Sequence, residues 1–178
     1  MEWHLDPDHT VAAFAVQHLT IAKVRGQFNK VSGILTFDPA KPAGTGLTVT
    51  IDVIGLYTGI KKRDIHLASP DFFDVLNQPT ITFRSTDCAM AGRRGRLTGE
   101  LTIRGTSRPI ILEVQLTEPI KVPAELGGET TLGLAARTTI NREDFGLNWN
   151  FPLGAGRLGI AKEVEITLDG EADLAVAD

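Results

Sequence analysis

The run LTVTIDV at residues 47–53 alternates apolar and polar side chains without a break. In an extended chain its four apolar side chains point one way and its two threonines and Asp52 point the other, because successive side chains of a strand lie on opposite faces. The run therefore predicts a β-strand with one buried and one exposed face.

The same period of two recurs along most of the chain. It is found at residues 12–18, 31–37, 80–86, 96–103, 110–117, 130–140 and 163–171. Together with the first run this makes eight strands, and most of the Gly- and Pro-rich clusters between them are short enough to join antiparallel neighbours. Such spacing favours a sandwich or a barrel over a parallel sheet. We predict an all-β, antiparallel, up-and-down, eight-stranded barrel.

Glycines occur inside several of the predicted strands, at Gly33, Gly99 and Gly133. A glycine within a strand is typical of a bend or of a close approach to the backbone, including approach by a ligand. These positions therefore favour a curved, closed sheet.

One segment departs from the strand pattern and predicts a short helical element over one end of the barrel. Thr58 can cap a helix over residues 59–67, and Ser69 with Pro70 resembles a second helix start. A further helical turn is predicted over residues 19–24. The longer helical segment is expected to cross a mouth of the barrel.

Length and composition restrict the class of protein. The 178 residues predict one domain over 1–178, and 18 basic against 22 acidic side chains, without a basic block, exclude a nucleic-acid partner. Cys88 is the sole cysteine, which excludes an internal disulfide. No apolar run approaches the roughly 20 residues of a membrane span, so no stable membrane insertion is expected. The opening residues resemble no secretory signal, which predicts a cytoplasmic location; removal of a leader would instead imply the periplasm or secretion.

Two patterns that resemble ligand motifs are better explained as turns. Residues 154–159 fit G-x-G-x-x-G, but a β-rich run follows them where a dinucleotide site needs a helix. His4, Asp6, Asp8 and His9 offer metal ligands, yet polar residues around a proline usually form a turn. We therefore expect no metal site.

Seven short motifs follow one another in order. They are Trp3 with LDPDHT at 5–10, FAVQHL at 14–19, RDIHL at 63–67, DFFD at 71–74, PTITF at 79–83, GELTIRG at 99–105 and NREDFGL at 141–147. Each is weak alone, but together they span nearly the whole chain, and through them it resembles the YceI-like family of lipid-binding proteins. The resemblance implies a lipocalin-like eight-stranded barrel whose apolar interior holds a long isoprenoid or a related amphiphile.

An eight-stranded barrel is just wide enough to be filled by side chains or to enclose one ligand. Burial of each methylene contributes about 0.8 kcal/mol, so a lipid tail can bind through burial alone. We expect non-catalytic binding, storage or transport of a polyprenyl or quinone-like lipid, with no cofactor other than such a lipid, by a monomer or a homodimer.

Two other functions stay open from the sequence alone. His9, His18 and His66, with Asp64, could gather at one barrel end and serve a small hydrolase or isomerase that acts on an apolar substrate. A filled barrel would instead suit a ligand-free stress or scaffold protein.

We expect the ligand to contact the inner faces of the strands and the helical segment. The predicted lining consists of Phe14, Val16, His18, Phe37, Val49, Ile51, Phe72, Phe73, Phe83, Leu101, Leu112 and Leu134. His18 could equally be a histidine that is hydrogen-bonded at the barrel end. Arg63 and Asp64 are interpreted as a structural ion pair that pins the helical segment. Arg142, near Asp144, is interpreted as a turn anchor.

Overall fold

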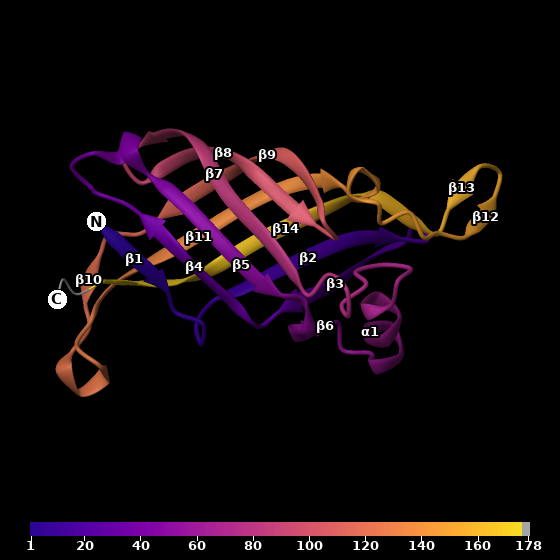
Figure 1. Ribbon diagram of the computed structural model, residues 1–178, viewed down its shortest axis with the longest axis horizontal. Coiled ribbons are helices and arrows are strands. Elements are labelled where there is room, and N and C mark those ends of the chain that lie inside the picture. Colours follow the sequence, from indigo (N-terminus) through magenta and orange to yellow (C-terminus); the bar gives the residue numbers. More distant parts are fainter. Residues whose placement is uncertain (176–178) are drawn as a thin grey trace.

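The computed structural model describes residues 1–175 (Figure 1). Its strands are β1 (Glu2–Leu5), β2 (Val11–His18), β3 (Ala22–Phe28), β4 (Val31–Thr36), β5 (Gly46–Asp52), β6 (Leu56–Tyr57), β7 (Thr80–Ala91), β8 (Arg94–Ile103), β9 (Thr106–Leu116), β10 (Ile120–Lys121), β11 (Thr130–Asn141), β12 (Pro152–Gly154), β13 (Arg157–Leu158) and β14 (Ile160–Leu174). The helices are α1 (Lys61–Ala68) and the short 3-10 helices η1 (Pro42–Gly44), η2 (Val53–Gly55), η3 (Ala124–Leu126) and η4 (Arg142–Phe145). Within residues 1–175, no helix is long and apolar enough to cross a membrane.

The strands form a closed, antiparallel ring. β1 and β2 follow one another along a single edge of β14, and β4 and β3 pair with them on their other side. The ring continues through β5, β7, β8, β9 and β11, each paired with the strand before it. The ring closes where β11 pairs with β14, from Thr131↔Asp173 to Asn141↔Glu163. The predicted eight-stranded up-and-down barrel is confirmed.

One end of the barrel, at β1 and the last residues of β14 in Figure 1, is filled by large apolar side chains. Trp3, Leu35, Phe37, Leu47 and Leu97 are each at most 1% exposed. The indole Nε1 of Trp3 donates to the backbone oxygen of Phe37 at 3.0 Å, so its polar atom is satisfied inside the core. This end is solid.

The close approach predicted at the strand glycines is made by the protein itself. A Cβ on Gly99 would lie 2.5 Å from the ring of Phe83, and one on Gly33 would lie 2.3 Å from the backbone oxygen of Thr48. Both glycines therefore allow neighbouring strands and rings to pack closely in the barrel wall.

The helical turn predicted over residues 19–24 is wrong. Residues 18–21 form a tight turn, in which the Ile21 amide donates to the His18 oxygen at 3.0 Å, and the chain continues into β3. Leu19 and Thr20 have φ values of 54° and 61°. Three residues separate the paired His18 and Ala22, and two of them take the left-handed backbone conformation, yet neither carries the Asn or Gly that usually signals such a hairpin turn.

This turn provides a stability prediction. Replacing Leu19 with Asn and Thr20 with Gly is expected to raise the free energy of unfolding by about 1 kcal/mol, because the left-handed region costs a branched residue more than Asn or Gly. Urea denaturation of the double variant measures the change. An unchanged or lower midpoint would contradict the strain assigned to this turn.

The helical segment also differs in detail from the prediction. α1 begins at Lys61, and Thr58 does not cap it. The second helix expected at Ser69 is absent within the described residues: the chain makes turns there, in which the Phe72 and Asp74 amides both donate to the Ser69 oxygen at 3.0 Å. Asp74 has φ 51°, a left-handed residue that a helix cannot continue through.

Candidate functional site

A cavity of about 350 Å³ occupies the end of the barrel beside α1. Its apolar and aromatic lining consists of Ala12, Ala13, Phe14, Val16, Val24, Phe28, Ile51, Leu67, Phe72, Phe73, Ile81, Ile103, Ile140, Leu147, Trp149, Phe151, Ile160, Val164 and Ile166. Four polar side chains, His18, Arg63, His66 and Arg142, complete it. The barrel is therefore filled at one end and hollow at the other.

The twelve side chains predicted as a lining divide between these two ends. Those that line the cavity are Phe14, Val16, His18, Ile51, Phe72 and Phe73. Those that are buried without lining it are Phe37, Val49, Phe83, Leu101, Leu112 and Leu134. Contact of any of them with a ligand stays a prediction.

Aromatic side chains from three parts of the chain meet at the cavity. Trp149, in the segment after η4, packs edge-on against the ring of His66, with ring centres 4.6 Å apart, and lies 5.4 Å from that of Phe72. Phe151 continues this series and lies 6.2 Å from the ring of His18 at the end of β2. The turns after α1, the segment after η4 and β2 thus share one aromatic wall.

The base of α1 is anchored through Thr58. The Arg63 guanidinium donates to the hydroxyl and to the backbone oxygen of Thr58, both at 2.7 Å. The Asp64 carboxylate accepts from the Thr58 amide at 3.0 Å and from its hydroxyl. The two charged residues therefore pin the segment through a shared threonine, where we had predicted an ion pair between them.

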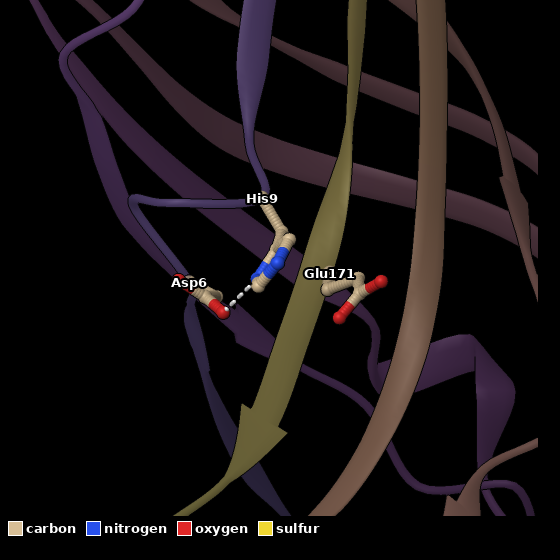
Figure 2. A group of neighbouring side chains, drawn as sticks. All are labelled: Asp6, His9 and Glu171. Carbon is tan, nitrogen blue, oxygen red and sulfur yellow. Dashed lines mark hydrogen bonds and ion pairs between the residues drawn. The ribbon is translucent and has the colours of Figure 1, made fainter. Parts of the chain in front are cut away.

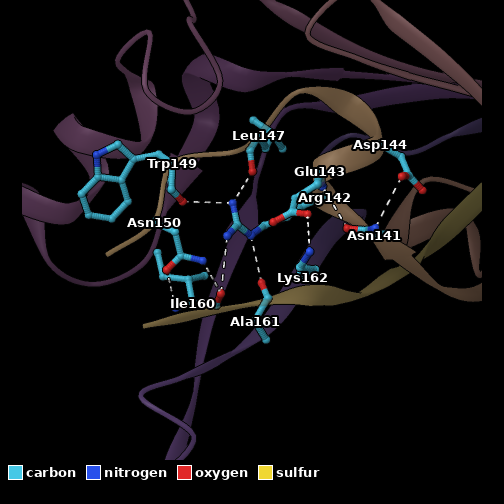
Figure 3. A network of polar contacts seen from close by, with 10 residues as sticks. All are labelled: Asn141, Arg142, Glu143, Asp144, Leu147, Trp149, Asn150, Ile160, Ala161 and Lys162. Atoms are coloured by element: carbon cyan, nitrogen blue, oxygen red, sulfur yellow. Dashed lines mark hydrogen bonds and ion pairs between the residues drawn. The ribbon is translucent and has the colours of Figure 1, made fainter. Parts of the chain in front are cut away.

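Arg142, the first residue of η4, is a buried cation, only 3% exposed, whose side chain reaches the start of β14 (Figure 3). Its guanidinium donates to the backbone oxygens of Ala161 at 2.9 Å, Trp149 at 3.1 Å and Ile160 at 3.4 Å, and also to that of Leu147. Burial lowers its pKa. Arg142 does anchor a turn, as predicted, but through carbonyl oxygens, and it contributes to the cavity wall.

The polar side chains of the cavity wall are all basic. Its ionisable side chains are two arginines and two histidines, and no carboxylate, hydroxyl or thiol lines the cavity within the described part of the chain. A lone carbonyl, an amide oxygen or an anionic head group is therefore matched by the wall, whereas a cationic head group is not.

The three histidines do not gather around the cavity. His18 and His66 line it, and His66 Nε2 lies 3.0 Å from a carboxylate oxygen of Asp71. His9 lies instead in the turn between β1 and β2, beside Asp6 and Glu171 (Figure 2). The group proposed for an enzyme is thus divided between two sites.

Asp6, His9 and Glu171 bring three potential ligand atoms within 4.8 Å of one another. Glu171 comes from β14, so no local spacing in the sequence could have predicted its presence here. His9 Nδ1 lies 2.6 Å from the Asp6 carboxylate. This bond raises the pKa of His9 and lowers that of Asp6, because it favours the charged form of each group.

The pair predicts a pH-dependent contribution to stability. Its His9 part is lost as pH rises through the raised pKa above 6.5, and its Asp6 part is lost as pH falls through the lowered pKa below 3.8. Asp6→Asn should lower the His9 pKa toward its ordinary value in an NMR titration of the imidazole, while the neighbouring carboxylates of Glu171 and Asp8 keep part of the increase. The stability difference between variant and parent should be largest between these limits, and an unchanged His9 titration would contradict the pairing.

A closed antiparallel barrel with an apolar cavity beneath a helical segment is the architecture of lipocalin-like binding barrels. The model of the YceI-like domain matches residues 3–172, and the chain belongs to this family.

Relatives and solved structures agree with this assignment. A UPF0312 protein from Pseudomonas aeruginosa is 32% identical over 163 residues, which cover 92% of this chain and 81% of the relative. The crystal structure of Burkholderia cenocepacia BcnA aligns with a TM-score of 0.79 at 26% identity and covers 94% of this chain and 98% of that one. A polyisoprenoid binding domain from Saccharophagus degradans aligns with a TM-score of 0.70 at 18% identity, covering 97% and 98%, and shows the same fold.

Proposed function

We propose that the chain binds a long-chain isoprenoid or a related amphiphilic lipid, polyprenyl or quinone-like, in the hollow end of the barrel, and stores or transports it without chemical change. The observation that carries this proposal is the cavity of about 350 Å³ with its apolar and aromatic wall. Pockets of this size and character bind ligands largely through burial of apolar surface.

Membership of the YceI-like family and the fold shared with a polyisoprenoid binding domain support a lipid ligand. The filled end of the barrel limits how far the lipid can enter, so the tail would occupy the hollow end and the remainder would extend toward the mouth. Arg63, His18 and His66, at the wall, would meet a hydrogen-bond-accepting head group.

Binding without catalysis is supported by the composition of the wall. Within residues 1–175, its polar side chains are two arginines and two histidines, and no serine, threonine or cysteine hydroxyl or thiol stands beside either histidine in the wall. His66 contacts aromatic rings and the partly exposed Asp71.

Organic extraction of the purified protein followed by mass spectrometry tests the proposal. We expect an isoprenoid or quinone-type lipid from the parent protein and none from Val16→Trp, in which the cavity is blocked. An empty extract, combined with no uptake of an apolar fluorescent probe by the parent protein, would overturn a binding function and favour a scaffold.

A further inference from the structure

We infer that the chain docks on the surface of an anionic lipid bilayer through its mouth face, defined as Ile21, Ile60, Lys61, Lys62, Ile65 and Leu76. This inference rests on the proposed function, since a lipid carrier must meet the bilayer that supplies or receives its ligand. These residues belong to the β2–β3 turn, to α1 with the residue before it, and to the turns after it, at the end of the barrel opposite β1 (Figure 1).

The four apolar side chains of the mouth face are largely exposed to solvent. Leu76 is 97% exposed, Ile21 81%, Ile65 63% and Ile60 54%. Four of the twelve large apolar side chains that are exposed within residues 1–175 belong to the mouth face. An apolar concentration beside a cavity entrance is typical of an interaction surface.

The two segments that carry the mouth face are basic in an acidic chain. Residues 18–25 and 57–78 hold five basic and three acidic side chains, whereas the remaining sequence holds 13 basic and 19 acidic. The local excess of positive charge is complementary to anionic head groups, and the acidic remainder would be repelled by them. The charge distribution thus orients the cavity entrance toward the bilayer.

α1 connects the docking surface to the cavity. Arg63, His66 and Leu67 line the cavity, while Lys61, Lys62 and Ile65 are exposed and do not line it. Isoleucines interspersed with lysines suit the interfacial zone of a bilayer, where apolar side chains enter the acyl boundary and lysines meet the head groups. A continuous apolar patch, without lysines among the isoleucines, would instead favour a protein partner or a second copy of the chain.

Co-sedimentation with vesicles tests this docking. We expect the parent protein to bind phosphatidylglycerol-containing vesicles and to bind phosphatidylcholine vesicles at least about tenfold more weakly, with binding that falls as salt rises. Ile65→Ser with Leu76→Ser, and separately Lys61→Glu with Lys62→Glu, should each reduce partitioning onto anionic vesicles by about tenfold or more.

The matched control is Ile120→Ser with Leu126→Ser, which removes two similarly exposed apolar side chains (61% and 75%) outside the mouth face. It should partition like the parent protein. Equal partitioning of the control and the Ile65/Leu76 variant, or no binding of the parent protein to anionic vesicles, would overturn the inference. So would a dimer that is lost in the mouth variants.

Uptake of an apolar fluorescent probe from solution separates this inference from the proposed function. The Ile65/Leu76 variant should take up the probe as the parent protein does, because neither side chain lines the cavity. Failure of uptake by the parent protein would refute the proposed function, whereas normal uptake with no vesicle binding would refute the docking alone.

Discussion

Val16→Trp is expected to lower the affinity for a lipid or an apolar probe by roughly a hundredfold while the barrel stays folded. Val16 lies in β2 and pairs with Val24 on one side and Val164 on the other, and all three side chains line the cavity. An indole there would take the space of about four methylenes of a tail, and at about 0.8 kcal/mol each their loss corresponds to about 3 kcal/mol. Fluorescence titration with an apolar probe measures the affinity.

Gln17→Trp is the matched control for this variant. Gln17 is the next residue of β2, on the opposite side of the strand, and does not line the cavity. Its tryptophan should leave the affinity within about twofold of the parent value, since it adds bulk outside the barrel. If both variants bind the probe as the parent does, the cavity beside α1 is not the binding site.

Arg142→Met should lower the free energy of unfolding by about 3–5 kcal/mol. Methionine keeps most of the side-chain volume but removes every donor, so the backbone oxygens of Ala161, Trp149 and Leu147 lose their bond to the guanidinium in a buried region. The Ile160 oxygen keeps the Asn150 amide, which donates to it at 2.7 Å. Unsatisfied buried acceptors cost about 1–3 kcal/mol each before relaxation or entry of water. Urea denaturation of the two proteins under identical conditions gives the difference.

Arg137→Met separates this effect from the loss of any arginine. The Arg137 side chain is 75% exposed in β11, and its Nε donates to the Glu113 carboxylate at 2.7 Å. Loss of such a surface pair should cost less than about 1 kcal/mol. Equal destabilisation by the two substitutions would contradict the structural role assigned to Arg142.

The barrel could be predicted because alternation is a local property that each strand displays by itself. β3 was missed although Val24 and Phe28 alternate with polar residues, because Leu19 and Thr20 carry no turn chemistry and residues 19–24 were interpreted as a helical turn. β1 is only four residues long, which leaves too few alternations to recognise.

The site was harder to predict than the fold. Alternation separates the inner face of a strand from the outer one, but it does not tell how far along the barrel axis a residue lies. Phe14 and Phe83 are both inward-facing phenylalanines, yet one borders the hollow end and the other belongs to the filled part. Trp149 and Phe151 come from an irregular segment without a periodic signal, so their place at the cavity depends on tertiary structure alone.

The ring closes through the last strand, β14, which affects how the chain folds during synthesis on the ribosome. β14 joins both ends of the chain, since its Ala172 pairs with Leu5 while its other edge pairs with β11. The edges of β1 and β2 that pair with β14 stay unpaired until β14 has left the ribosome. Unpaired strand edges can pair with those of other nascent chains and so promote aggregation. Pairing of β1 and β2 with β14 joins residues far apart in the sequence, so it should be a slow step of folding. A chaperone that covers the free edges of β1 and β2 would therefore raise the yield of folded protein.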